Sequence, residues 1–365
     1  MEFFHTHISP LAYELIKETL DSTFISEGKR VKQFEEALDT QLGLSNPVAV
    51  NSGTSALHLA LVLAGVGPGD EVILPAQTFV ATGLVILMQR ATPVFSDIDP
   101  LTGNISPESI KAKITDRTKA IIPVHWGGYP CDMDEINELA EHHNLTVIED
   151  AAHALGATYK GRPIGAISSF TAFSFQAIKH LTTGDGGALC CKRKEDARQA
   201  VVCRWFGIDR ENSKPSILGE REYDLNRLGF KYHMNDLDAS IGLANICDFQ
   251  TRRTRREENG MWYRQELNKI PGLQLLKLDE QRTHAYWLFT VLVESREAFI
   301  KKMASHAVPV SVVHLRIDKN RIFGGLNEEL IGQAHFNATQ VSIPVHEGLT
   351  DREKYIIVNA IRSGW

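Results

Sequence analysis

Residues 119–152, KAIIPVHWGGYPCDMDEINELAEHHNLTVIEDAA, contain two apolar runs on either side of a helical segment. KAIIPVH (119–125) and LTVIEDAA (145–152) are predicted to be strands buried on both faces, because their apolar residues do not alternate with polar ones. DMDEINELAEHHN (132–144) is predicted to be a helix. A strand, a helix and a second strand in this order predict two parallel strands joined by a crossover.

The same alternation continues on both sides of this unit. We expect further strands at PVAV (47–50), DEVILP (70–75), TPVFSDID (92–99), SSFTAFSF (168–175) and GALCC (187–191). Right-handed crossovers then place helices on both sides of the sheet. The sequence therefore predicts an α/β fold with a mostly parallel central sheet and helices on both faces.

The pattern changes after about residue 245. A long charged helix that contains RRTRREENG (252–260) precedes two short strands at 286–294 and 308–314, and a helix closes the chain. We therefore predict a large domain at residues 1–245 and a smaller α+β domain at 246–365. Residues 207–228 are predicted to form a polar loop.

Composition excludes several classes of protein. The 365 residues carry a formal net charge of −6, which gives no electrostatic case for nucleic-acid binding, and the RRTRR cluster is followed by two glutamates typical of a solvated helix face. The five cysteines form no C-x-x-C pair, so neither a disulfide framework nor a metal site is expected. No signal peptide and no membrane-spanning run is predicted, and we expect a cytoplasmic protein.

The segment NSGTSA (51–56) opens a helix directly after a strand. Free N–H groups and the helix dipole favour an anion at such a position, and a phosphate would suit it. The alternative is a serine or threonine cap without a ligand.

Asp150 ends an apolar strand in IEDAAH (148–153), and a helical turn would bring His153 beside it. A carboxylate in this position needs a cation or hydrogen-bond donors. A helix-capping aspartate with a histidine in the core explains the pair equally well.

The segment FSFQAIKHLTTGDGG (173–187) places Lys179 between a predicted strand and a glycine cluster. A desolvated lysine has a lowered pKa, and its neutral amine forms a Schiff base with a carbonyl. A single lysine more commonly extends to the surface. The combination of a phosphate-binding helix start, a strand-end carboxylate and a lysine is what pyridoxal phosphate requires.

Seven segments resemble, in order, those of the DegT/DnrJ/EryC1/StrS sugar aminotransferase family. They are NSGTSALHLAL, PAQTFVATG, PVFSDIDPLTGNI, IIPVHWGGYPCDMDEI, VIEDAAHALGATYKGRPIG, FSFQAIKHLTTGDGGAL and GFKYHMNDLDASIGLANI. The resemblance implies the fold type I aminotransferase architecture, pyridoxal 5'-phosphate as cofactor with pyridoxamine 5'-phosphate as an intermediate, and a homodimer with shared active sites.

The resemblance also implies roles for individual residues. Lys179 would hold the cofactor aldehyde and carry a proton, Asp150 would pair with the pyridine nitrogen, and His153 would lie near the 3-hydroxyl. Phe79 would stack on the ring, unless it is an ordinary core aromatic residue. The residues expected to hold the phosphate are Gly53, Thr54, Ser55 and Ser174.

Three positions depart from the pattern or qualify it. Lys231 in GFKYHMND stands where many members have an asparagine that reaches the phosphate of the neighbouring subunit. Asp185 in TGDGG is one methylene shorter than the usual glutamate. A dehydratase branch carries histidine in place of the lysine, and here Lys179 is retained with His180 after it.

The function that the resemblance implies is amino transfer from L-glutamate to a nucleotide-linked keto-sugar, with 2-oxoglutarate released. A 4-keto-6-deoxyhexose aminated at C4 is the expected substrate, for surface polysaccharide or glycan biosynthesis. The alternatives are a nucleotide-sugar 3-dehydratase and a regulator that has this fold without catalysis. Weaker candidates for substrate contact are His314, Trp205 and Arg204.

Overall fold

The computed structural model describes residues 1–210 and 212–365, and a seven-stranded sheet forms its centre. The strand order is β1-β9-β8-β5-β4-β2-β3. Their bounds are β1 (Pro47–Val50), β9 (Gly187–Cys191), β8 (Phe170–Ser174), β5 (Thr146–Asp150), β4 (Thr118–Ile121), β2 (Glu71–Pro75) and β3 (Thr92–Ser96). Strands β3, β2, β4, β5 and β8 pair in parallel, while β9 is antiparallel to both of its neighbours. The predicted mostly parallel sheet is therefore confirmed.

Two apolar clusters show that helices cover both faces of this sheet, as predicted. The first cluster packs one face against α2 (Lys29–Leu42), α5 (Pro107–Lys113), α6 (Met133–His142) and α8 (Asp236–Ile246). The second packs the other face against α3 (Gly53–Leu63), α4 (Val80–Met88) and α7 (Lys194–Cys203). Because side chains alternate along a strand, Val147 joins the first cluster and Ile148 the second.

The C-terminal part has its own sheet and its own apolar cluster. The strands β12 (Leu273–Leu275), β14 (Phe289–Val293) and β15 (Gln340–Ile343) pair antiparallel. The helices of this part are α9 (Phe249–Glu266), α10 (Arg296–Ser305), α11 (Ile331–Thr339) and α12 (Asp351–Arg362). The domain boundary at 245–246 stays a prediction.

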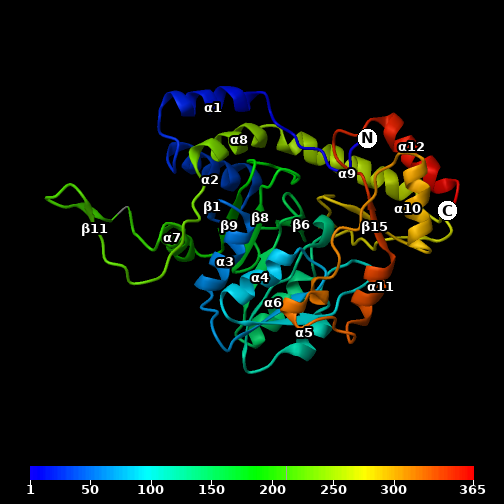
Figure 1. Cartoon of the computed structure of the whole chain (residues 1–365), viewed down its shortest axis with the longest axis horizontal. Helices are drawn as coiled ribbons and strands as arrows, with labels where there is room; N and C mark the ends of the chain where they lie inside the picture. Colours follow the sequence, from blue (N-terminus) through cyan, green and yellow to red (C-terminus); the bar gives the residue numbers. More distant parts are fainter. Residues whose placement is uncertain (211) are drawn as a thin grey trace.

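The N-terminal residues lie against this C-terminal part, and both chain ends lie near α10 and α12 (Figure 1). The terminal amine of Met1 lies 3.9 Å from the carboxylate of Glu353. The Phe4 ring stacks on Trp287 with 5.1 Å between centroids. The chain then forms α1 (Leu11–Asp21), which packs on α8.

Short elements complete the described part of the chain. They are β6 (Thr158–Tyr159), β7 (Arg162–Pro163), β10 (Lys214–Pro215), β11 (Arg221–Glu222), β13 (Arg282–Thr283), η1 (Trp126–Gly128), η2 (Ile317–Lys319) and η3 (Arg321–Phe323). Within the predicted polar loop 207–228, β10 and β11 form a hairpin that projects from the body of the molecule (Figure 1), and Glu211 lies outside the described residues.

Two expectations about the C-terminal part are wrong. The segment 308–314 is not a strand: it has an isolated bridge between Ser311 and Ser342, and Pro309 lacks the N–H group that would extend a ladder. The RRTRR cluster is not wholly solvated, because Arg252 and Arg256 are buried. The guanidinium of Arg256 lies 2.6 Å from Glu347, and Arg252 donates to the carbonyls of His180 and Asn245.

No helix among the described residues is both long enough and apolar enough to cross a membrane.

Candidate active site

The predicted site residues of the large part gather at the carboxyl ends of the parallel strands. Asp150 is the last residue of β5, Ser174 is the last of β8, and Gly53 begins α3 just after β1. Phe79 follows β2 and precedes α4. Ligands of open α/β sheets bind at this edge, since the loops there leave the sheet in opposite directions.

Lys179 lies in the loop after β8, half-buried, with its amine facing an aromatic ring. Its Nζ atom is 3.6 Å from the centroid of Trp287. Burial lowers the pKa of Lys179 to about 7, although the negative charge of Asp150 acts in the opposite direction. A substantial fraction of this amine is therefore uncharged and nucleophilic near neutral pH.

His180, the neighbouring residue, is directed away from this site. Its Nε2 atom bonds the carbonyl of Ala285 at 2.9 Å, and its own carbonyl accepts from Arg252. The side chain beside Asp150 and Trp287 is therefore the lysine and not the histidine.

Asp150 is a buried carboxylate that receives two hydrogen bonds. The hydroxyl of Thr82 donates to Oδ2 at 2.7 Å, and the N–H of Ala152 donates to Oδ1 at 3.2 Å. Burial raises the pKa of Asp150, while these two bonds and the charge of Lys179 act to lower it. The Thr82 hydroxyl is itself 2.7 Å from that of Thr78, which precedes α4, so two linked hydroxyls lead to the carboxylate.

His153 is buried and stacks on Trp287, with 3.7 Å between ring centroids and 15° between planes. It lies in a turn rather than a helix, where the N–H of Ala154 bonds the carbonyl of Ala151. Burial first, and then the charge of Lys179, hold the pKa of His153 well below its usual value, so the ring is neutral. Its Nδ1 atom is buried and has no hydrogen-bond partner among the described residues.

The start of α3 is open to an anion. The Ser52 hydroxyl caps the helix by accepting from the N–H of Ser55, and the Ser52 carbonyl accepts from Ala56. Within the described chain this leaves the N–H groups of Gly53 and Thr54 for a ligand. The Ser55 hydroxyl donates to Asn51 at 2.6 Å.

Ser174 lies directly against this helix start. A Cβ atom added to Gly53 would lie 2.9 Å from the Cβ of Ser174 and 3.3 Å from the carbonyl oxygen of Phe173. Glycine at position 53 therefore allows β8 and the first turn of α3 to approach closely. The two groups together form a compact cradle of N–H and hydroxyl donors.

Phe79 is 54% exposed and lies at the mouth of the site, so it is not an ordinary core residue. Its ring is 5.1 Å from that of His314, which arrives from the C-terminal part. Burial, and then Lys179, lower the pKa of His314 to about 4. This arrangement keeps His314 among the candidates for substrate contact.

The residues around position 205 divide into one exposed and one buried group. Lys231 is exposed, and its amine lies 3.9 Å from the centroid of Trp205. Arg204 is buried, where it pairs with Glu27 at 2.7 Å and with Glu35 at 2.5 Å. Arg204 therefore serves the packing of the N-terminal segment, and the expected contact with substrate is wrong for this residue.

Asp185, the shortened position of TGDGG, is exposed, and its carbonyl accepts from the Thr183 hydroxyl. The nearby Asp238 has its pKa raised to about 6, by burial first and then by the charge of Asp185. The shorter carboxylate thus lies at the surface beside α8.

Sequence reasoning missed two residues of the site. Thr82 lies within PAQTFVATG, in the first turn of α4, and a hydroxyl residue in a segment that follows a strand end was a usable signal. Trp287 was assigned only to a strand, since no pattern near position 287 points to a lysine in the other part of the chain.

These residues fit pyridoxal phosphate. The N-terminus of α3 offers N–H donors for a phosphate, and Asp150 offers a buried acceptor for a protonated ring nitrogen. Lys179 offers an amine with a pKa of about 7 for the aldehyde. The unpartnered Nδ1 of His153 is one buried polar atom that such a ligand would satisfy.

Comparisons with known proteins agree with this geometry. The model of the DegT/DnrJ/EryC1/StrS aminotransferase family matches residues 8–362. The spore coat polysaccharide biosynthesis protein SpsC of Bacillus subtilis is 36% identical over 362 residues, which are 95% of this chain and 92% of SpsC. GDP-perosamine synthase of Caulobacter vibrioides is 36% identical over 367 residues, which are 95% of this chain and 94% of that enzyme.

A solved structure also matches the whole fold. Spr1654 of Streptococcus pneumoniae, in its PLP form, is 28% identical with a TM-score of 0.91, and the match covers 100% of this chain and 98% of Spr1654. The same protein was also solved in its PMP form.

Proposed function

The chain belongs to the DegT/DnrJ/EryC1/StrS aminotransferase family and is an aminotransferase with pyridoxal phosphate as its cofactor, and from this premise we propose that it aminates a nucleotide-linked keto-sugar. L-glutamate is the amino donor and 2-oxoglutarate the released product. One observation carries the proposal. Lys179, Asp150 and the open start of α3 all lie at the same edge of the sheet.

Each of these residues has one task. When bound, pyridoxal phosphate supplies an electron sink for the charge that develops at the substrate carbon. Lys179 would hold the cofactor aldehyde, and its free amine would take the proton from the substrate carbon and return it. Asp150 would accept a hydrogen bond from the protonated pyridine nitrogen, and His153 would interact with the 3-hydroxyl. Phe79 would stack on the cofactor ring.

The phosphate is held at the start of α3. Gly53 and Thr54 supply N–H groups, and Ser174 supplies a hydroxyl from the end of β8. Ser55 supports the cap of this helix instead of donating to the phosphate, because its N–H donates to the Ser52 hydroxyl and its own hydroxyl donates to Asn51. A phosphate in this cradle fixes the position of the reactive aldehyde relative to Lys179.

The acceptor in this proposal is a 4-keto-6-deoxyhexose attached to a nucleotide, aminated at C4 for surface polysaccharide or glycan biosynthesis in the cytoplasm. The names of the two curated relatives support a sugar-nucleotide substrate and a role in polysaccharide synthesis. The free thiols of the five cysteines support a reducing compartment.

A 3-dehydratase is the second candidate within the family, and the geometry disfavours it. The dehydratase branch has histidine at the lysine position, whereas here the histidine next to Lys179 is bonded to Ala285 outside the site. A regulator without catalysis is disfavoured because the lysine, the carboxylate and the phosphate cradle are all in place.

A homodimer with shared sites completes the proposal. The projecting hairpin bears exposed apolar side chains, which a second copy of this chain would cover. They are Ile217, Leu218, Tyr223, Leu225 and Leu228. Lys231, exposed at the base of this hairpin, would then reach the phosphate in the partner subunit.

Mixing two inactive variants tests the shared site. Lys179→Ala and Lys231→Ala each lack one component, and subunit exchange creates one intact site per mixed dimer if the components come from different subunits. We expect roughly a quarter of the parental activity after equimolar exchange, because half of the dimers are mixed and each has one intact site. If Lys231 serves its own subunit, no activity returns.

The reaction itself is tested with a panel of nucleotide-linked keto-sugars and L-glutamate. We expect one amino-sugar, found by mass spectrometry, in a 1:1 ratio with 2-oxoglutarate, and a yellow cofactor band in the parent. Lys179→Ala should lose turnover, with Lys17→Ala as a surface control. A Lys179→Ala protein that turns over like the parent would disprove the assignment, and a deoxygenated sugar without nitrogen would favour the dehydratase.

A further inference from the structure

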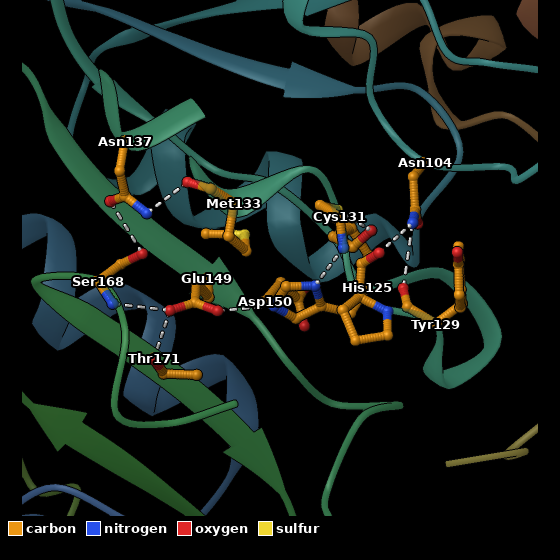
Figure 2. A network of polar contacts seen from close by, with 12 residues as sticks. Asn104, His125, Tyr129, Cys131, Met133, Asn137, Glu149, Asp150, Ser168 and Thr171 are labelled. Atoms are coloured by element: carbon orange, nitrogen blue, oxygen red, sulfur yellow. Dashed lines mark hydrogen bonds and ion pairs between the residues drawn. The ribbon is translucent and has the colours of Figure 1, made fainter. Parts of the chain in front are cut away.

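Behind Asp150, on the opposite face of the sheet, lies a buried polar network that the proposed mechanism does not use (Figure 2). Glu149 precedes Asp150 on β5, and because side chains alternate its carboxylate faces α6. It lies 2.8 Å from the Nε2 atom of His125, and both side chains are fully buried.

The hydrogen bonds of His125 determine which nitrogen carries its proton. The backbone N–H of Cys131 donates to Nδ1 at 3.1 Å, so Nδ1 presents a lone pair. Nε2 therefore carries the hydrogen and donates to Oε2 of Glu149. The neutral form of His125, in this one tautomer, satisfies both contacts.

The other oxygen of Glu149 also accepts. Ser168 donates its N–H to Oε1 at 3.0 Å, and the Thr171 hydroxyl donates at 3.1 Å. Three donors from β8, the segment before it and His125 thus converge on one carboxylate, as Figure 2 shows. The network joins β8 and the chain after β4 to β5.

The same histidine also holds the backbone of Asp150. Regular pairing of β4 with β5 extends to Ile121, which lies opposite Val147. Beyond it, the N–H of His125 donates to the carbonyl of Asp150 at 3.1 Å, and the N–H of Asp150 donates to Pro123 at 2.9 Å. His125 therefore contacts residue 149 through its ring and residue 150 through its main chain.

We propose that His125 and Glu149 are positioning residues that orient the Asp150 carboxylate toward the pyridine nitrogen of the cofactor. They contact the end of β5 on the face of the sheet that α6 covers. On the opposite face, Thr82 of α4 donates a hydrogen bond to the Asp150 carboxylate. This inference rests on the proposed function, since it assigns the ring nitrogen to Asp150. The alternative is a pair that stabilises the fold without influence on the cofactor.

Glu149→Gln tests the inference because glutamine has the same shape as glutamate, but one acceptor oxygen of the side chain becomes an N–H₂ donor. The amide N–H₂ must face either the N–H of His125 or the donors from Ser168 and Thr171, so a donor meets a donor in both orientations. Glu71→Gln is the matched control. Glu71 is a buried glutamate at the opposite end of the same sheet, where it accepts from Thr115 and Arg117.

The readouts are the dissociation constant of pyridoxal phosphate for the apoprotein, the pH midpoint of the cofactor absorbance change, and the temperature of unfolding. We expect Glu149→Gln to weaken cofactor affinity about tenfold and to shift the pH midpoint, as the loss of one hydrogen bond to a carboxylate would. Glu71→Gln should lower the unfolding temperature without either change.

A double-mutant cycle with Asp150→Asn separates the two explanations. If Glu149 acts through Asp150, its substitution changes affinity less than about twofold once Asp150 is already asparagine. An equal loss in both backgrounds, or no loss in the parent, overturns the inference. If Glu149→Gln does not fold, Thr171→Val replaces it in the same cycle, since valine keeps the shape of threonine and removes one donor to Glu149.

Failure of the proposed function has a different signature. A parent protein that shows no cofactor band, or an Asp150→Asn variant with parental affinity, overturns the role of Asp150 and the inference with it. A parent and an Asp150→Asn variant that behave as proposed, together with an unaffected Glu149→Gln variant, overturn the inference alone.

Discussion

The amine of Lys179 lies 3.6 Å from the centroid of the Trp287 ring, although the two residues belong to different parts of the chain. The indole N–H donates to the carbonyl of Ile178 at 3.0 Å, which ties the ring to the loop that carries the lysine. His153 stacks on the same indole. Trp287 thus contacts both the nucleophile and a neutral histidine.

Replacement of Trp287 should therefore impair the lysine. Trp287→Phe keeps an aromatic face but loses the bond to Ile178, whereas Trp287→Leu also loses the face and about 0.5–2 kcal/mol of cation–π attraction. We expect kcat/KM to fall about tenfold or more in the leucine variant and less in the phenylalanine variant.

Trp262 provides the control for this substitution. Trp262 lies in α9, away from the candidate active site, and the ammonium of Lys354 is 5.2 Å from the centroid of its ring. Trp262→Leu should lower the unfolding temperature and leave kcat/KM near the parental value. Equal kinetic losses in the two leucine variants would mean that Trp287 acts through general stability.

The lowered pKa of Lys179 makes the stability of the apoprotein depend on pH. Between about 7 and the ordinary value of 10.5, the folded lysine has released a proton that the unfolded chain retains. The contribution of Lys179 to stability therefore rises with pH across this window and is least favourable below 7. Lys179→Met removes this dependence.

Urea unfolding of the two apoproteins from pH 6 to pH 10 measures the difference. The methionine variant should be more stable than the parent at pH 6, and the gap should narrow as the pH rises. Capture of pyridoxal by the parent should reach half of its maximum near pH 7. A gap that stays constant with pH would contradict the assigned burial of the amine.

The hydroxyl of Thr82 should matter for cofactor affinity because it donates to Asp150. Thr82→Val has nearly the same shape but leaves the buried carboxylate with one donor fewer, at a cost of about 1.5–3 kcal/mol. We expect the affinity for pyridoxal phosphate to fall at least about tenfold, and the pKa of Asp150 to rise further. Thr82→Ser should retain the affinity.

Thr19→Val is the control for Thr82, because Thr19 is also a buried helical threonine, bonded to Leu15 and Ser240. Equilibrium dialysis gives the affinities. Parental affinity in Thr82→Val would show that the hydroxyl is not needed for the role of Asp150.

Gly53→Ala should close the phosphate cradle. The new Cβ would lie 2.9 Å from that of Ser174, which is too close without movement of β8 or α3. We expect affinity for pyridoxal phosphate to fall more than about tenfold, whereas affinity for pyridoxal, which has no phosphate, should change little. Gly67→Ala is the control, since a Cβ there has no neighbour within 4 Å. Equal losses for both ligands would place the effect elsewhere than the phosphate.

Local patterns predicted the elements that carry the cofactor residues. Unbroken apolar runs identified the parallel strands. Asp150 and Ser174 were predicted near the ends of two of these strands, and in the structure they are the last residues of β5 and β8. The strand expected at 308–314 was wrong because pairing depends on the neighbour, and proline limits the pairing there.

The sequence by itself determined the parallel sheet and the candidate roles of Lys179, Asp150 and Gly53, because each role depends on a residue type at the end of a local element. Only the tertiary structure decided that Trp287 faces the lysine and that His125 and Glu149 support Asp150 from behind. Periodicity reports which face of an element is apolar, whereas the partner of a buried polar group depends on which distant segments pack together.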